Sequence, residues 1–365
     1  MSVTPQTNAD LPAIAQALAE RDDIVISGHV SPDGDCLGSQ LVLAHALRAL
    51  GKRATCVLAT DEPYDEKLAF MPGMEGMVPA SSFEGPVGAF VAVDVPTVER
   101  MGDAAALHDA AALTVTVDHH AVPTSMADLT YVDPDAAATA MIVWELAALL
   151  GARRDAAMAT CAYTGLVTDT GRFQYQNTDA AALAAAADMV AAGADPALVA
   201  RHVYQSRSLA SVQLEGAAIG RMRLSAGGSV ALSWVTKEDF ARFGATKPDA
   251  EPLIDALRSL AGVRVACMLR DQGDMVRGSF RAKDGTNVAE LAAAFGGGGH
   301  KAAAGFTVQA PIDEAVAQVT ALLDQAFPED VPTCPGAPGG PDTSGGAKGA
   351  QGGPAAGTSK GGGAA

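Results

Sequence analysis

The first 190 residues alternate short apolar runs with longer helical patterns, and this alternation restricts the fold more than any other feature of the chain. Strand-like runs lie at 23–27 (DIVIS), 53–59, 89–93 (AFVAV) and 113–117 (LTVTV). Helical patterns cover 38–50, which ends at Gly51, and also 137–150 and 155–168. This order predicts an α/β fold whose mostly parallel sheet is flanked by helices. Ligands of such sheets bind beyond the carboxyl ends of the strands.

The rest of the chain predicts a smaller second domain and a tail. The first domain is assigned to 1–190, and Ala-rich helical patterns make 191–214 a helical connector. Strand patterns at 228–235, 263–269 and 275–281, with helical patterns at 252–260, 287–295 and 311–327, predict a C-terminal α/β domain over 215–330. Gly, Pro, Ala and Ser dominate 331–365, so a disordered tail is expected there.

Composition and charge exclude several classes of protein. The 365 residues are 48% hydrophobic and 18% charged, which is enough apolar material for two buried cores. The net charge of −17 disfavours nonspecific binding to long duplex nucleic acid. Neither a membrane-spanning run nor a secretory signal is recognised, and the five scattered cysteines form no CxxC motif. A cytoplasmic protein with reduced thiols and no membrane association is therefore expected.

Carboxylates and imidazoles gather after the strands of the first domain. Four separate segments deliver them, and three of these segments follow a strand directly. The side chains concerned are His29, Asp33, Asp35, Asp94, Asp118, His119, His120 and Asp169. Because the strands are predicted to be parallel, these residues are expected at one edge of the sheet.

These residue types indicate a metal site. Carboxylates and imidazoles suit Mn²⁺, and carboxylates suit Mg²⁺. Five clustered aspartates would repel one another, and two divalent cations would neutralise most of that charge. Two ions bridged by a carboxylate are the usual arrangement for phosphoryl hydrolysis. Taken singly, Asp94 or Asp169 could be a helix cap or a turn residue, but caps and turns do not explain the whole set. Cys36, inside the first turn, is best explained as a small buried side chain, with a reactive thiol or a metal ligand as the alternatives.

The second domain carries a glycine-rich segment, FGGGGHKAAAGF, at 295–306. Its glycines, among them Gly297, Gly298 and Gly299, can let the backbone approach a ligand and form an anion-binding nest, and His300 follows them directly. This favours a phosphate- or nucleotide-binding loop over a merely flexible one.

Basic residues lie just upstream of that segment. Ser279, Arg281 and Lys283 alternate and are expected on one face of a strand, as a phosphate clamp or as a solvated face. Six Lys and Arg against four Asp and Glu between 264 and 301 suit a short anionic substrate.

Taken together, the motifs GHVSPDGDCLGS, AVDVP, VDHH, TDTGRF and GGGGHKAAAG resemble the DHH phosphoesterase family with its DHH-associated C-terminal domain, over about residues 10–328. The resemblance implies that Asp94 bridges two Mn²⁺ ions. The ligands of the first ion would be His29, Asp33 and Asp94, and those of the second would be Asp35, Asp94, His119 and Asp169.

The same resemblance assigns the remaining roles. Asp118 would support the site from behind, and His120 would contact the scissile phosphate. Arg281, the glycine loop and His300 would hold the nucleotide across a cleft between the domains. Cys36 stands where a smaller residue is more usual, and the tail lies outside the family pattern.

The expected function is a cytoplasmic hydrolase that uses two Mn²⁺ ions, with Mg²⁺ as the alternative, to activate water. Its substrates would be short single-stranded RNA, cut to nucleoside 5′-monophosphates, and 3′-phosphoadenosine 5′-phosphate (pAp), converted to AMP. Three alternatives stay open: a phosphodiesterase acting on cyclic-di-AMP or pApA, a nucleotide-binding sensor without turnover, and an RNA-binding accessory module built on the second domain. A homodimer is a further expectation.

Overall fold

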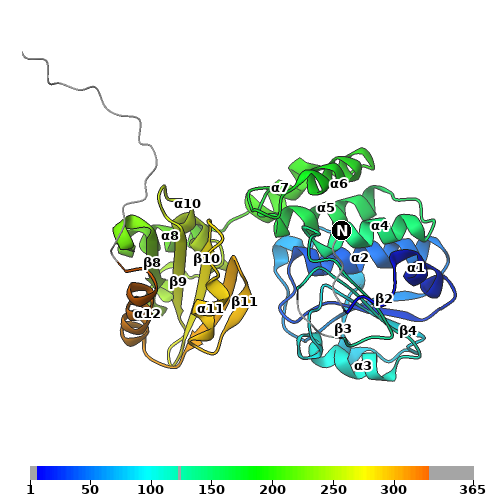
Figure 1. The fold of residues 1–365 in the computed structure, drawn as a ribbon, viewed down its shortest axis with the longest axis horizontal. Helices are drawn as coiled ribbons and strands as arrows, with labels where there is room; N and C mark the ends of the chain where they lie inside the picture. Colours follow the sequence, from blue (N-terminus) through cyan, green and yellow to red (C-terminus); the bar gives the residue numbers. More distant parts are fainter. Residues whose placement is uncertain (1–5, 122–124, 329–365) are drawn as a thin grey trace, which may run out of the picture. The chain divides into compact units, whose positions relative to one another are not determined.

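The chain forms two compact units in a computed structural model that describes residues 6–121 and 125–328, apart from the side chain of His300. The first unit comprises Met1–Gly220 and Val235–Leu253, and the second comprises Arg221–Trp234 and Ile254–Ala365. Figure 1 shows the path of the chain through both units. The domain boundaries predicted at 190 and 214 stay predictions, and the predicted tail lies outside the described residues.

A six-stranded parallel sheet forms the centre of the first unit. Its order is β3-β2-β1-β4-β5-β6, and each neighbouring pair is parallel. The strands are β1 (Ile24–Ser27), β2 (Ala54–Leu58), β3 (Val78–Pro79), β4 (Ala89–Val93), β5 (Thr114–Asp118) and β6 (Leu129–Val132). The strand order reverses between β1 and β4, which is where a doubly wound sheet opens its ligand crevice. The predicted mostly parallel sheet is confirmed.

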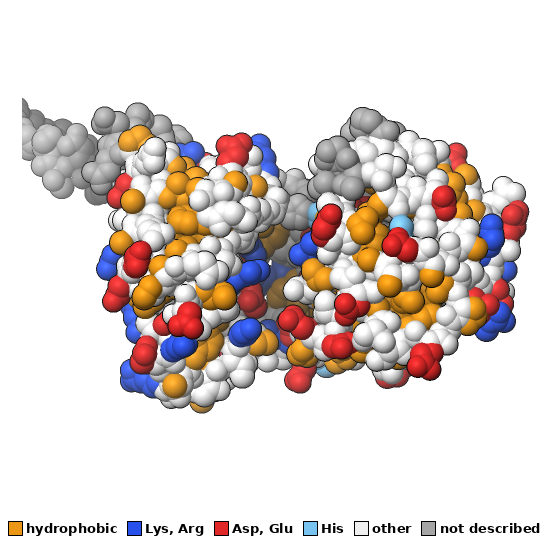
Figure 2. All heavy atoms as spheres, turned by 90° about the horizontal axis from the view of Figure 1, so that it is seen from below, with side chains coloured by type: hydrophobic (Ala, Val, Ile, Leu, Met, Phe, Trp, Pro, Cys, Tyr) orange, Lys and Arg blue, Asp and Glu red, His pale blue; other side chains and the backbone are white. Residues whose placement is uncertain are grey.

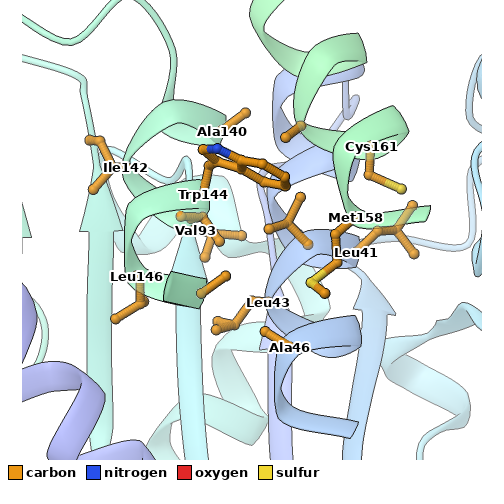
Figure 3. Close-up of a cluster of buried hydrophobic side chains, with 14 of the residues drawn as sticks. Leu41, Leu43, Ala46, Val93, Ala140, Ile142, Trp144, Leu146, Met158 and Cys161 are labelled. Atoms are coloured by element: carbon orange, nitrogen blue, oxygen red, sulfur yellow. The ribbon is translucent and has the colours of Figure 1, made fainter. Parts of the chain in front are cut away.

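Helices cover both faces of this sheet (Figure 1). One face carries α1 (Leu11–Ala19), α2 (Gly34–Ala49), α4 (Thr139–Leu149) and α5 (Ala156–Asp169), which share a large apolar core with the strands. In Figure 3, Leu41 of α2, Trp144 of α4 and Met158 of α5 lie in this core, together with Val93 of β4. The other face carries α3 (Ala105–Ala110) and the short 3₁₀ segment η4 (Val98–Ala104).

Helix α2 begins at Gly34, four residues earlier than predicted. The reason is Asp33, whose carboxylate accepts hydrogen bonds from the backbone N–H groups of Asp35 and Cys36 at 3.0 Å each. The predicted turn is therefore the first turn of a helix. This places Asp35 and Cys36 on helical backbone whose orientation the sheet fixes.

Helices α2 and α5 approach each other closely at a glycine. A Cβ atom on Gly38 would lie 2.5 Å from the backbone carbonyl oxygen of Cys161 on α5, a distance that real Cβ atoms do not show. Only glycine permits this spacing. The contact matters for the site, because α2 carries Asp35 and α5 ends at Asp169.

The second unit contains a six-stranded sheet of order β11-β12-β10-β9-β8-β7. The strands are β7 (Arg223–Ser225), β8 (Val230–Val235), β9 (Val265–Asp271), β10 (Val276–Ala282), β11 (Gly298–His300) and β12 (Ala303–Val308). The pairs β7–β8, β9–β10, β10–β12 and β11–β12 are antiparallel. Alternate residues of β9, β10 and β12 form a core with α11 (Val288–Ala293) and α12 (Ile312–Ala326), so the predicted smaller α/β fold is confirmed. Strands β7, β11 and β12 were not predicted.

The remaining helices are α6 (Ala180–Ala191), α7 (Pro196–Tyr204), α8 (Leu209–Arg221), α9 (Lys237–Phe243) and α10 (Leu253–Ser259). Among the described residues no single helix is long and apolar enough to cross a membrane. Only α6 and α7 taken together have sufficient length and composition, and they are bent by 110° at the break between them. On the face drawn in Figure 2, acidic, basic and apolar side chains are interspersed.

Candidate metal centre

The first part of the site is the turn that follows β1. His29 is 6% exposed there, and its Nε2 atom lies 3.4 Å from a carboxylate oxygen of Asp94 and 3.9 Å from one of Asp33. Its other ring nitrogen, Nδ1, lies 2.9 Å from the carbonyl oxygen of Val30. A histidine whose Nδ1 donates to a carbonyl keeps Nε2 available as a metal ligand.

Asp94 lies at the centre of the site. It follows β4 directly and has a φ of 60°, a left-handed conformation that is uncommon for a residue other than glycine. Its carboxylate accepts a hydrogen bond from the Thr139 hydroxyl at 3.0 Å and faces Nε2 of His119 at 3.6 Å and Nδ1 of His120 at 3.5 Å. With His29, three imidazoles from two segments surround one carboxylate.

Asp35 connects the site to the start of another helix. Its two carboxylate oxygens accept hydrogen bonds from the backbone N–H groups of Thr139 at 2.7 Å and Ala140 at 2.8 Å, which are the first residues of α4. These N–H groups would otherwise lack partners within their own helix. The carboxylate of Asp35 is fully buried and lies 4.0 Å from Nε2 of His119.

The DHH segment begins with Asp118, the last residue of β5, and both of its imidazoles are held in place. Nδ1 of His119 lies 3.2 Å from the carbonyl oxygen of Ala136, so Nε2 faces the carboxylates of Asp35, Asp94 and Asp169. Asp118 holds the neighbouring ring differently: its carboxylate is 2.8 Å from Nδ1 of His120 and also accepts the backbone N–H of His119 at 2.8 Å. The buried Asp118 therefore orients the motif.

Asp169 closes the site from the last residue of α5. One carboxylate oxygen lies 3.8 Å from Nε2 of His119. Burial raises the pKa of Asp169 to about 7, and the positive charge of His119 counteracts this only in part. Burial and the charge of Asp94 likewise raise the pKa of Asp35 well above its ordinary value.

The pKa values of two imidazoles are also raised, whereas the pKa of Asp94 is lowered. Burial by itself would lower the pKa of His29, but its hydrogen bond with Asp94 and the charge of Asp33 raise it to about 9. Burial opposes the charged form of His119 too, while Asp169 and Asp94 raise its pKa to about 10. Burial raises the pKa of Asp94, yet the His29 hydrogen bond and the charge of His119 lower it overall. Excess negative charge thus dominates the cluster.

The donor set fits divalent metal ions. Two groups share one histidine: Asp94, His119 and His120, and Asp35, His119 and Asp169; within each group the ligand atoms lie within 4.8 Å of one another. Two imidazoles have Nδ1 beside a backbone carbonyl and Nε2 directed at carboxylates. The surrounding carboxylates raise the pKa values of His29 and His119 and so favour positive charge here, which divalent cations would supply.

Cys36 lies beneath this cluster. Its sulfur is buried and accepts a hydrogen bond from the backbone N–H of His29 at 3.2 Å. A Cβ atom on Gly28 would lie 2.1 Å from that sulfur, so the thiol fills a space that glycine leaves open. Cys36 also joins His29 and Asp94 in a third group of ligand atoms within 4.8 Å of one another. Burial raises the pKa of this thiol well above its ordinary value. The four described cysteines are free and buried.

The residues singled out in the second unit lie on one sheet. Ser279 and Arg281 occupy the face of β10 opposite the core, and Lys283 lies beyond the end of the strand. Lys283 donates to the carbonyl oxygen of Leu260 at 2.8 Å, so it does not continue the row on β10 as expected. Arg270 of β9 donates to the hydroxyl of Ser279 at 2.9 Å.

The glycine-rich segment packs partly against its own sheet. A Cβ atom on Gly297 would lie 2.2 Å from the carbonyl oxygen of Gly305, and one on Gly299 would lie 2.6 Å from that of Ala303. Gly298, by contrast, has open space around it. Two of these glycines are thus required by the neighbouring strand β12, whatever the segment binds, and His300 forms the end of β11.

Sequence reasoning missed three residues near these sites. Thr139 binds Asp94 and starts α4, Ala136 supplies the carbonyl oxygen for His119, and Arg270 holds Ser279. Thr139 lies shortly after β6, so a polar residue at a strand-to-helix turn was a signal available in the sequence. Backbone carbonyls carry no such signal.

Comparisons with known proteins agree with this geometry. Residues 23–166 match the N-terminal domain of the DHH family, and residues 227–329 match the DHHA1 domain. A Thermus thermophilus protein named bifunctional oligoribonuclease and PAP phosphatase NrnA is 32% identical over 308 residues, which are 84% of this chain and 91% of that protein. A Bacillus subtilis protein of the same name is 28% identical over 291 residues, covering 79% of this chain and 90% of the relative.

A solved structure extends the likeness to the whole fold. The crystal structure of an exopolyphosphatase-related protein from Bacteroides fragilis superposes with a TM-score of 0.81 at 26% identity, covering 87% of this chain and 96% of that one. Both domain matches occur in the order predicted from the motifs. The chain therefore belongs to the DHH family, and it is a hydrolase of that family.

Proposed function

We propose that this hydrolase is a Mn²⁺-dependent phosphoesterase that cuts short RNA to nucleoside 5′-monophosphates and converts pAp to AMP. The observation that carries the proposal is the convergence of His29, His119 and His120 on the single carboxylate of Asp94. The names of the Thermus and Bacillus relatives support the choice of substrates. The cytoplasm as compartment and a homodimer as assembly belong to the same proposal.

Two ions would share the cluster through Asp94. His29, Asp33 and Asp94 would hold one ion, and Asp35, Asp94, His119 and Asp169 would hold the other, which is supported by the distances of 3.4–4.0 Å among their ligand atoms. When bound, such a pair would activate water and stabilise negative charge on the oxygens of the phosphoryl group. With Mg²⁺ as the alternative ion, the same carboxylates would serve.

His120 would bind the scissile phosphate. Asp118 fixes the orientation of this ring through the 2.8 Å contact with Nδ1, and we assign the contact with a substrate oxygen to Nε2. A donor at this position would stabilise negative charge on the oxygens of the phosphate. Asp118 would thus orient His120 without touching the substrate.

The second unit would bind the rest of the nucleotide. Arg281 and Ser279 share the open face of β10, and Arg270 keeps the hydroxyl of Ser279 in place. Gly298, around which space is open, and the adjoining Gly297, Gly299 and His300 complete the proposed substrate-binding set. An interdomain cleft stays a prediction, because the structure defines each unit by itself.

A product analysis tests the proposal. Purified protein with Mn²⁺ is incubated with pAp, RNAs of two to five nucleotides, a long RNA and cyclic-di-AMP, and the products are resolved over time. We expect rapid conversion of pAp and of the shortest RNAs, and loss of both activities in Asp94→Asn and His119→Ala. Asp109→Asn, whose side chain is 81% exposed, serves as the control and keeps full activity.

The outcomes separate the alternatives. A preference for cyclic-di-AMP would indicate instead that the protein is a phosphodiesterase acting on cyclic-di-AMP or pApA. Metal-dependent nucleotide binding without any turnover would indicate a sensor. RNA binding that needs neither metal nor Asp94, and that falls steeply with salt, would indicate an accessory RNA-binding role.

A further inference from the structure

Arg100 lies beside the metal centre and has no role in the assignments above. It belongs to η4, and its carbonyl oxygen accepts the backbone N–H of Val30 at 2.8 Å, so its backbone is tied to the turn that carries His29. Its side chain is exposed, and Nη2 lies 3.1 Å from Nδ1 of His29. Within the described residues, no carboxylate forms an ion pair with this guanidinium.

The contact with His29 does not satisfy the guanidinium. Nδ1 of His29 also lies 2.9 Å from the carbonyl oxygen of Val30, and Nε2 faces Asp94 and Asp33. When Nε2 serves as a ligand, Nδ1 carries the proton and donates to that carbonyl. Arginine has only donors, so Arg100 then finds no acceptor on the ring and its N–H groups remain available.

The electrostatics of this position favour an anionic ligand. A permanently charged guanidinium next to a site for divalent cations repels them, which weakens metal binding unless negative charge lies between the two. Phosphate oxygens supply that charge, and the planar fork of arginine binds two of them at once. We propose that Arg100 binds the phosphate group of the substrate at the metal centre, through oxygens that the ions leave free.

This inference rests on the proposed function and specifies its substrate contacts. pAp and short RNA share a tetrahedral phosphate with at least two non-bridging oxygens. Arg100 is therefore a substrate-binding residue common to both activities, whereas Arg281 and Ser279 in the second unit contact other parts of the nucleotide.

The experiment compares Arg100→Ala, Arg100→Lys and a matched control, Arg153→Ala. Arg153 is exposed and lies between the end of α4 and the start of α5, while the site lies at the opposite ends of these helices. The length of α4, with its 11 residues, separates the two places by about 16 Å. The measurements are kcat and KM for pAp and for an RNA of three nucleotides, calorimetric binding of AMP at saturating Mn²⁺, and Mn²⁺ affinity.

We expect Arg100→Ala to lower kcat/KM for both substrates by about 10- to 100-fold, the value of a charge-assisted pair of hydrogen bonds. AMP binding should weaken by a similar factor, while Mn²⁺ affinity stays equal or rises. Arg100→Lys should recover part of the loss, because it keeps the charge without the fork. Arg153→Ala should stay within twofold of the unsubstituted protein.

Two results overturn the inference. AMP affinity that is unchanged in Arg100→Ala removes the phosphate contact, and a fall in Mn²⁺ affinity with normal AMP binding shows instead that Arg100 only positions His29. If the unsubstituted protein hydrolyses neither substrate, the proposed function fails on its own. AMP binding then still decides the role of Arg100, since binding that depends on Arg100 supports it and absence of AMP binding refutes it.

Discussion

Substitution of Asp35 separates its structural role from its role toward metal. In Asp35→Ala both buried N–H groups at the start of α4 lose their acceptor, at about 1–3 kcal/mol each, or about 2–6 kcal/mol in total. In Asp35→Asn the amide oxygen retains one of these hydrogen bonds. Both variants remove the same charge, so relief of repulsion from Asp94 and Asp169 cancels between them.

We therefore expect Asp35→Ala to be less stable than Asp35→Asn by about 1–3 kcal/mol, although neither variant binds metal normally. The assay is urea unfolding in the presence of EDTA. Trp144 lies on α4 itself, and a Trp234→Phe background removes the fluorescence of the second unit. The fluorescence of Trp144 then reports the unfolding of the unit that contains the substitution.

Equal stability of the two variants would refute the reasoning. It would mean that the N–H groups of Thr139 and Ala140 find other acceptors, and that Asp35 does not hold the start of α4. A matched substitution, Asp109→Asn, removes an exposed carboxylate and should change the free energy of unfolding by less than about 0.5 kcal/mol.

Three further predictions follow from the charges and the packing. Without metal, the protein should lose stability as pH rises from about 4 to 9, since the folded pKa values of Asp169 (about 7), His29 (about 9) and His119 (about 10) exceed their unfolded values of 3.8, 6.5 and 6.5. Stabilisation present below each unfolded pKa is lost as pH passes the folded one, and a flat melting temperature in EDTA between pH 5 and 9 would contradict this. Mn²⁺ binding should release protons and tighten from pH 6 to pH 8, which calorimetry in two buffers of different ionisation heat measures. Gly38→Ala should destabilise the protein by about 1–3 kcal/mol and weaken Mn²⁺ binding by parting α2 from α5, whereas Gly216→Ala, in open space on α8, should be neutral or slightly stabilising.

The fold of the first unit was predictable because its signals are local. Strands β1, β2, β4 and β5 are short β-rich runs, and α2, α4 and α5 have a capping aspartate or a glycine after their end, as Asp33 and Gly51 show. The elements β3, β6, α1 and α3 were not predicted. Strands β11 and β12 were missed because GGGGHKAAAGF contains small residues without a strand-like alternation. Gly297 and Gly299 pack against β12, a requirement that becomes visible only when the two segments are paired.

The sequence by itself determined which residue types stand at the ends of the strands. Parallel strands place their carboxyl ends at one edge of the sheet. The parallel direction of the strands therefore predicts that His29, Asp94 and His119 lie close together. Tertiary structure decided how each group is held and therefore what it can bind. Asp35 meets the N–H group of Thr139 across 104 residues of chain, and Arg100 meets His29 across 71. Contacts of this range depend on how helices and 3₁₀ segments pack on the sheet, and no local pattern encodes that packing.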